Sequence, residues 1–159
     1  MKLLYRGSRD GALSKDFHEK CDNMGPTVTL IKSEEGFIFG GYTSISWSSN
    51  FETCMDNNSF IFTLLNMYNL NPIIFKPKLS GYICHSEFEG PNFGIEKKIL
   101  LLRKKFDIRI GEDYENNSSY SEFPNIYEDI SGKGKSIFIG KNKDGKFKVI
   151  EIEVFGLYN

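Results

Sequence analysis

His18 and Cys21 have side chain types and a spacing that could place two metal ligands on one helix. They lie three positions apart with Asp22 beside them, so on a helix both would project towards the same ion. Structural zinc takes four ligands, however, and the sequence has neither a second ligand cluster nor a Cys-x-x-Cys pair. We therefore expect no metal and no other cofactor, and a partly buried helix is the simpler interpretation.

Cys84 and His85 place a thiol directly beside an imidazole, a combination that nucleophilic cysteines use. Neighbouring residues of a strand point to opposite faces of a sheet, so this pair is poorly arranged for base-activated attack. A peroxide-reducing cysteine also needs a lowered thiol pKa and usually a resolving partner, and the sequence shows neither. A thiol-based antioxidant enzyme that uses Cys21, Cys54 or Cys84 stays an alternative function.

Gly132-Lys133-Gly134-Lys135 is similar in composition to a phosphate-binding loop. Such loops bind anions through backbone N–H groups at the start of a helix, whereas here the sequence predicts a strand over residues 135–140. A Gly-x-Ser-x-Gly nucleophile elbow is also absent from the sequence. No catalytic residues are assigned, and these patterns favour a protein that is not an enzyme.

Charged and aromatic side chains near turns are the candidates for partner binding. Arg6, Arg9 and Asp10 lie among glycines, where they either hold a turn or form a polar docking surface. Trp47 is flanked by serines, and it either anchors a partner or fills the core. The expected binding positions are Arg6, Arg9, Asp10, His18, Asp22 and Trp47.

Composition limits the class of protein. With 159 residues the chain has the length of one ordinary domain, and we expect residues 1–159 to form it. The 20 lysines and arginines nearly balance 21 aspartates and glutamates, which gives no basic footprint for nucleic acid. The longest aliphatic run, Ile99 to Leu102, is far shorter than the ~20 apolar residues of a membrane-spanning helix. Without a secretory signal, and with three unpaired cysteines, a cytoplasmic protein is expected.

The N-terminal part of the sequence predicts one helix and one hairpin. Ser14 is expected to cap a helix over residues 15–21. Residues 27–31 and 37–39 are strand-like runs whose spacing is typical of a hairpin. Gly40-Gly41 in the second strand indicates a bulge or a close approach of another part of the chain.

The middle of the sequence predicts further short strands. Residues 60–65 read as a buried strand, and flanking prolines confine residues 73–75 to a short or edge strand. Residues 79–84 are expected to pair with that edge strand. The apolar block in residues 96–105 suits a strand or a helix, and the alternation in residues 106–110 favours a strand.

The C-terminal part predicts a long loop followed by a hairpin. Polar residues dominate between positions 111 and 131, which indicates a mobile surface excursion. Asp144-Gly145 is a hairpin signal between strands over residues 135–140 and 147–155. The core-facing residues of the last strand are expected to be Ile150, Ile152 and Val154. Many short strands with few helices predict an α+β, mainly β fold, a β-sandwich with helices at its edges.

Short motifs follow one another in order along nearly the whole chain. They are Leu3-Leu4-Tyr5-Arg6-Gly7, Gly25-Pro26-Thr27, Gly40-Gly41-Tyr42-Thr43, Gly90-Pro91-Asn92-Phe93-Gly94 and Ile152-Glu153-Val154-Phe155-Gly156-Leu157. This series resembles the TLDc domain, a module of eukaryotic oxidation-resistance proteins and of several trafficking and coactivator relatives. In that family a further segment usually precedes the Leu-Leu-Tyr motif, so we expect a truncated form or a short variant. The glycine-rich continuation common after the Phe-Gly pair is replaced here by Ile95-Glu96-Lys97.

The resemblance implies a fold and a type of function. TLDc domains are two-sheet antiparallel β-sandwiches flanked by short helices, and no agreed catalytic residues come with the family. Members are linked to protection from oxidative stress, and several bind the vacuolar proton-pumping ATPase and influence its assembly. We therefore expect a noncatalytic protein-interaction module with a subunit of that ATPase as partner. A carbohydrate-binding sandwich is a further alternative, suggested by the aromatic fraction of 14%.

Overall fold

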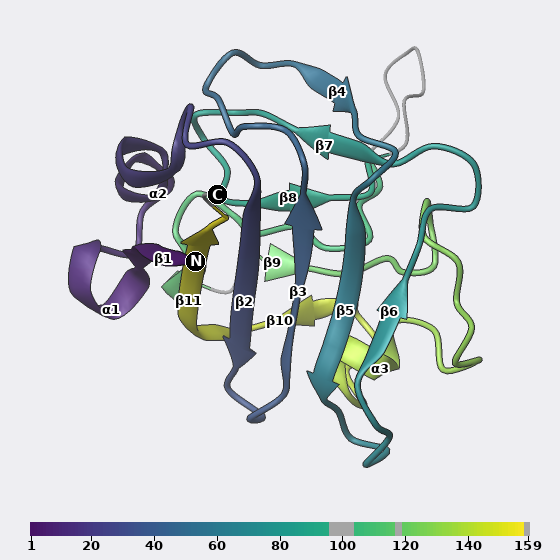
Figure 1. Ribbon diagram of the computed structural model, residues 1–159. Helices are drawn as coiled ribbons and strands as arrows, with labels where there is room; N and C mark the ends of the chain where they lie inside the picture. The colour runs from purple at the N-terminus through teal and green to yellow at the C-terminus, as the bar shows by residue number, and fades with distance from the viewer. Residues whose placement is uncertain (96–103, 117–118, 158–159) are drawn as a thin grey trace.

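A large antiparallel sheet forms the front layer of the computed structural model, which describes residues 1–95, 104–116 and 119–157 (Figure 1). Its six strands run in the order β1-β11-β2-β3-β5-β6. Their bounds are β1 (Lys2–Arg6), β2 (Thr27–Ser33), β3 (Ile38–Thr43), β5 (Phe60–Leu65), β6 (Ile73–Phe75) and β11 (Val149–Gly156). The N-terminal and C-terminal strands therefore pair with each other at one end of the sheet.

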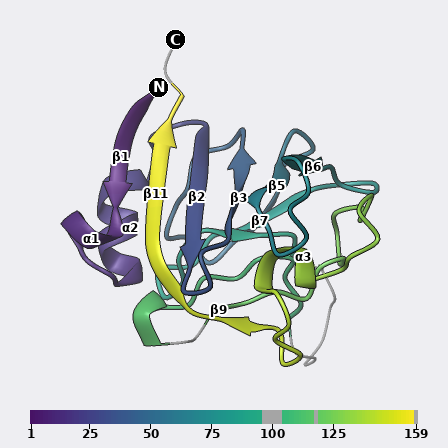
Figure 2. The ribbon, with the colours of Figure 1, turned by 90° about the horizontal axis from the view of Figure 1, so that it is seen from below.

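Two small sheets form the second layer behind the first (Figure 1). One contains β4 (Thr53–Met55), β7 (Tyr82–Cys84) and β8 (Asn92–Phe93), and the other pairs β9 (Ser119–Tyr120) with β10 (Lys146–Phe147). The short helices are α1 (Gly7–Asp10), α2 (Ser14–Cys21), α3 (Ser136–Ile139) and the 3-10 turn η1 (Tyr114–Asn116). Figure 2 shows α1 and α2 beside β1, at the end of the large sheet opposite β6. The predicted α+β, mainly β sandwich is confirmed.

Aromatic side chains fill the space between the layers, and one glycine makes their packing possible. A Cβ atom at Gly41 of β3 would lie 2.6 Å from the ring of Phe93 of β8. A larger residue at position 41 would therefore push the second layer away from the large sheet. At Gly40 a Cβ atom would overlap the backbone carbonyl of Thr29 on the neighbouring strand. Both contacts confirm the close approach that the Gly40-Gly41 pair predicts.

Several predicted elements are present, although β2 and β3 extend further than predicted and the cap of α2 differs. Helix α2, the β2–β3 hairpin, the buried strand β5 and the edge strand β6 are all present. The prediction that Ser14 caps α2 is wrong. The Asp16 carboxylate accepts the Leu13 backbone N–H at 3.1 Å, which leaves the Ser14 hydroxyl free to bond elsewhere.

The partner predicted for residues 79–84 is wrong. Strand β7 pairs with β4 and β8 in the second layer instead of with β6. Pro77 bridges to Tyr127 after β6 ends, so the chain leaves the large sheet before it can return along that edge. The fully buried Ile83 then packs into the core from the opposite layer.

The strand predicted over residues 135–140 is a helix. Ile137, Phe138 and Ile139 are all buried, and a single helical turn places three consecutive apolar side chains in the core where an extended strand would expose one. Gly140 ends the turn with a φ of 64°. Because no strand lies there, β10 pairs with β9 and the hairpin predicted at Asp144-Gly145 does not form.

The register predicted for the last strand is partly wrong. The β11–β2 ladder has an irregularity between Val149 and Glu151. Such a bulge shifts the alternation by one residue, so Val149 lies in the core while Ile150 is 46% exposed. Ile152 and Val154 are buried, as the sequence predicts.

The segment from 111 to 131 is not a surface excursion. Its buried side chains are Tyr114, Ser119, Ser121, Phe123 and Tyr127. Residues 106–110, which precede this segment, form isolated bridges to β8 and β9 but do not form the predicted strand. The prediction for residues 96–105 falls mostly on residues 96–103, which lie outside the described part of the chain.

Candidate functional site

Helix α2 is tied to two segments that lie far from it in the sequence. The Ser14 hydroxyl donates a hydrogen bond of 2.8 Å to the backbone carbonyl of Glu87. The Ser14 backbone N–H donates one of 2.7 Å to the carbonyl of Glu112. These bonds fix α2, the turn around Glu87 and the chain at Glu112 as the sides of one surface feature.

His18 makes the tightest connection within this feature. Its Nδ1 atom lies 2.7 Å from the Asp22 carboxylate, and its Nε2 atom lies 2.8 Å from the Ser86 carbonyl and 3.0 Å from that of Glu89. Carbonyl oxygens only accept, so Nε2 must donate, and Nδ1 is occupied by Asp22. Neither ring nitrogen is available to a metal ion, and the role of His18 is to hold α2 against the 86–89 turn.

The metal hypothesis for His18 and Cys21 has no geometric support. Cys21 has no exposed surface, and Asp22 already accepts hydrogen bonds from His18 and from the Ser49 hydroxyl, the latter at 2.7 Å. Within residues 1–95, 104–116 and 119–157, no group of three or more His, Cys, Asp and Glu side chains is arranged to hold an ion. What the arrangement offers is a shaped and rigid surface.

A cavity of about 530 Å³ opens between α2 and the 86–88 turn. We call it the α2 groove, and the side chains that define it are Leu13, Lys15, Glu19, Glu87, Phe88 and Glu112. All six are exposed. His18 and Asp22 also line the groove, so the structure brings these two expected binding residues together at its floor.

Phe88 of the α2 groove packs beside a second exposed phenylalanine, Phe51. Phe51 is 61% and Phe88 54% exposed, and their ring centroids are 5.6 Å apart. Phe51 has a φ of 55°, a conformation that bulky side chains seldom adopt. Exposed aromatic pairs of this kind supply contact area to partners at low entropic cost.

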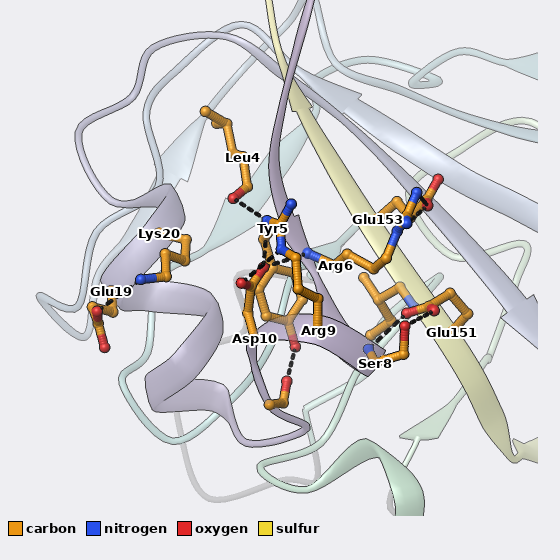
Figure 3. A network of polar contacts seen from close by, with 12 residues as sticks. Leu4, Tyr5, Arg6, Ser8, Arg9, Asp10, Glu19, Lys20, Glu151 and Glu153 are labelled. Carbon is orange, nitrogen blue, oxygen red and sulfur yellow. Dashed lines mark hydrogen bonds and ion pairs between the residues drawn. The ribbon is translucent and has the colours of Figure 1, made fainter.

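The N-terminal turn carries a network of polar contacts next to α2 (Figure 3). The Arg6 guanidinium bonds to Glu153 at 2.7 Å from Nε, as expected for residues that face each other across β1 and β11. The Ser8 hydroxyl donates to Glu151 at 2.5 Å. These bonds attach β1 and α1 to β11, the C-terminal strand.

Arg9 and Asp10 form the second half of this network (Figure 3). The Arg9 guanidinium donates to both carboxylate oxygens of Asp10, at 2.9 and 2.7 Å, and to the Leu4 carbonyl. The hydrogen bonds from Arg9 hold the pKa of the Asp10 carboxyl at about 2. The Asp10 carboxylate also accepts the Arg6 backbone N–H. Arg6, Arg9 and Asp10 therefore hold the turn, and the two guanidinium groups keep half-exposed surfaces.

Trp47 lies in the core and offers no surface to a partner. It has no exposed surface, its ring packs edge-on against Phe17 and Phe93, and its indole N–H donates to the Thr27 hydroxyl at 2.9 Å. Trp47 is therefore a core residue and does not anchor a partner at the surface.

The environments of the three cysteines disfavour their thiolate forms. Burial raises the pKa of the Cys84 thiol to about 11, and it raises the pKa of the Cys21 and Cys54 thiols as well. Burial also lowers the pKa of the His85 imidazole, whose Nδ1 accepts the Ser48 backbone N–H at 3.1 Å. The Nδ1 atom of His85 thus has a structural partner and is not available as a base for Cys84.

The Gly132–Lys135 loop is followed by the four-residue helix α3, contrary to the strand predicted there. The backbone N–H groups of Gly132, Lys133 and Gly134 already have acceptors within the chain. The Asp129 carboxylate accepts the N–H groups of Ser131, Gly132 and Gly134 at 2.7 to 3.0 Å. The loop therefore binds an anion that the chain itself supplies.

Among the described residues, no helix has the length and apolar character needed to cross a membrane.

Comparisons with known proteins give a family for nearly the whole chain and relatives for part of it. The model of the TLDc domain matches residues 1–158. MTOR-associated protein MEAK7 from Danio rerio is 41% identical over 63 residues, which cover 40% of this chain and 14% of that protein. The same protein from Gallus gallus is 33% identical over 63 residues with the same coverage. The matched stretch thus spans about one-seventh of the length of these relatives.

Proposed function

Because this chain belongs to the TLDc domain family, we propose that it is a noncatalytic protein-interaction module that docks a partner through the α2 groove. The observation that carries the proposal is a preformed groove with the exposed Phe51–Phe88 pair beside it. The polar residues at its floor, His18 and Asp22, bond to each other and hold the groove together. The single domain acts in the cytoplasm, which is supported by its three free cysteines.

The proposed partner is a subunit of the vacuolar proton ATPase. The family resemblance motivates this choice, and the name of the MEAK7 relatives describes an association of those proteins with MTOR. A module that binds one assembly state of the pump more tightly than another shifts the population towards that state. Protection from oxidative stress would follow from pump regulation and would require no chemistry on this chain.

Capture from the source cell tests this proposal. Folded wild-type chain used as bait is expected to recover subunits of the vacuolar proton ATPase. The same chain with Trp47→Ala, which is expected to lose its core packing, is the matched control for nonspecific recovery. Recovery of no ATPase subunit by bait with a cooperative unfolding transition would contradict the proposed partner.

Replacing Cys21, Cys54 and Cys84 together by alanine separates docking from thiol chemistry. Because burial raises the pKa of all three thiols, peroxide protection in cells is expected to be unchanged, within about twofold. Survival after peroxide exposure is the measurement, and cellular protein level is the control for stability. Loss of protection at an unchanged protein level would favour the antioxidant alternative.

A further inference from the structure

We propose that the α2 groove receives a basic segment of the partner protein, in which an apolar side chain lies between two arginine or lysine side chains. This inference rests on the proposed docking function and specifies the chemistry of the partner. It follows from three properties of the groove, which are its charge, its apolar edge and its rigidity.

The charge of the groove is predominantly negative. Glu19, Glu87 and Glu112 lie around it, and Lys15 is the one lysine or arginine among the described lining residues. Glu19 pairs with Lys20 at 2.9 Å. Among the described residues, no hydrogen bond or ion pair occupies the carboxylates of Glu87 and Glu112, in contrast to the internally paired Asp10, Asp22 and Asp107. Two unoccupied carboxylates that line one cavity are complementary to cationic groups of a partner.

The apolar edge selects a peptide over a simple cation. Leu13 is 38% exposed on the α2 side, and Phe88 faces the groove from the other side next to Phe51. One aliphatic side chain of a partner can pack between Leu13 and Phe88. A guanidinium group beside it can stack on the phenylalanine pair while it bonds to Glu87.

The groove is already formed before any partner binds. The Ser14 and His18 hydrogen bonds tie α2 to the 86–89 turn and to Glu112, so its two sides keep a fixed distance. A preorganised site loses little conformational entropy on binding. The same negative charge disfavours phosphorylated peptides, nucleic acid and anionic membrane surfaces, which leaves a basic protein segment as the occupant.

Fluorescence anisotropy with a labelled peptide tests the proposal. The probe is a glycine-serine peptide with an Arg-Leu-Arg centre, and its matched control carries Glu-Leu-Glu. The wild-type chain is expected to bind the arginine peptide with an affinity that falls as salt rises, and to leave the glutamate peptide unbound. The double variant Glu87→Lys, Glu112→Lys is expected to bind at least about tenfold more weakly.

One control variant separates the groove from general charge effects, and one further groove variant tests the apolar edge. Glu128→Lys with Asp144→Lys makes the same change of net charge at exposed positions beside β6 and before β10, and binding within about twofold of wild type is expected. Phe88→Ala removes the apolar edge without a change of charge, and about fivefold weaker binding is expected. Equal binding by wild type and the groove double variant would overturn the proposal.

The outcome is distinguishable from failure of the proposed function. Capture of the ATPase without peptide binding would overturn the basic-segment inference and leave the docking function in place. Peptide binding that the groove variants weaken, without capture of the ATPase, would support the inference and exclude the proposed partner.

Discussion

Replacement of Trp47 by alanine is expected to lower the free energy of unfolding by about 3–5 kcal/mol. Trp47 is the largest fully buried side chain, and it joins α2, through Phe17, to β8, through Phe93. Its removal leaves a cavity in the core and the Thr27 hydroxyl without its donor. This loss is a large fraction of the ~5–15 kcal/mol by which a domain is stable.

Urea denaturation followed by circular dichroism measures this effect. Phe88→Ala is the matched control, since it also deletes an aromatic side chain but from an exposed position, and a change within about 0.5 kcal/mol is expected. A Trp47→Ala variant as stable as Phe88→Ala would contradict the placement of Trp47 in the core.

Replacement of Asp107 by alanine is expected to destabilise the fold by at least about 3 kcal/mol near pH 5. Asp107 is fully buried, and its carboxyl accepts the backbone N–H groups of Asn125 at 2.6 Å, Ile126 at 2.8 Å and Tyr127 at 3.3 Å. Alanine would leave all three donors without this partner. Asp144→Ala, at an exposed position, is the control and should change stability by less than about 0.5 kcal/mol.

The pH dependence of the Asp107→Ala effect has a defined sign. Burial raises the pKa of the Asp107 carboxyl to about 7, although the three N–H donors act in the opposite direction. The unfolded chain has an aspartate pKa of about 3.9, so between these values the folded state binds more protons and the contribution of Asp107 to stability falls as pH rises. The cost of Asp107→Ala should therefore decline from pH 5 to pH 8. A cost that grows with pH would show that the N–H donors dominate and keep the carboxyl ionised.

Local patterns were sufficient to predict the elements whose contacts are local. The β2–β3 hairpin, α2 and the edge strand β6 depend on turn residues, apolar spacing and prolines near in the sequence. The helix α3 and the pairing of β10 depend instead on distant residues. An Ile-Phe-Ile run suits a strand equally well. The packing of Phe138 against Phe39, Phe75 and Phe123, which are distant in the sequence, favours the helical turn.

The candidate site was predicted only in part for the same reason. His18 and Asp22 are at the groove, but their hydrogen bonds give them a structural role. Glu87, Phe88 and Glu112 were missed because three separate segments meet there only in the folded chain. The run Glu87-Phe88-Glu89 carries a usable signal, since an aromatic residue between two acidic ones in a loop has no obvious place in the core.

Direct binding to the isolated peripheral sector of the vacuolar proton ATPase tests the central claim most directly. Biolayer interferometry would compare the wild-type chain, the Glu87→Lys, Glu112→Lys variant and the Glu128→Lys, Asp144→Lys control. We predict saturable binding by the wild type and the control, and at least about tenfold weaker binding by the groove variant. No binding by the folded wild-type chain, or equal binding by all three proteins, would contradict docking through the α2 groove.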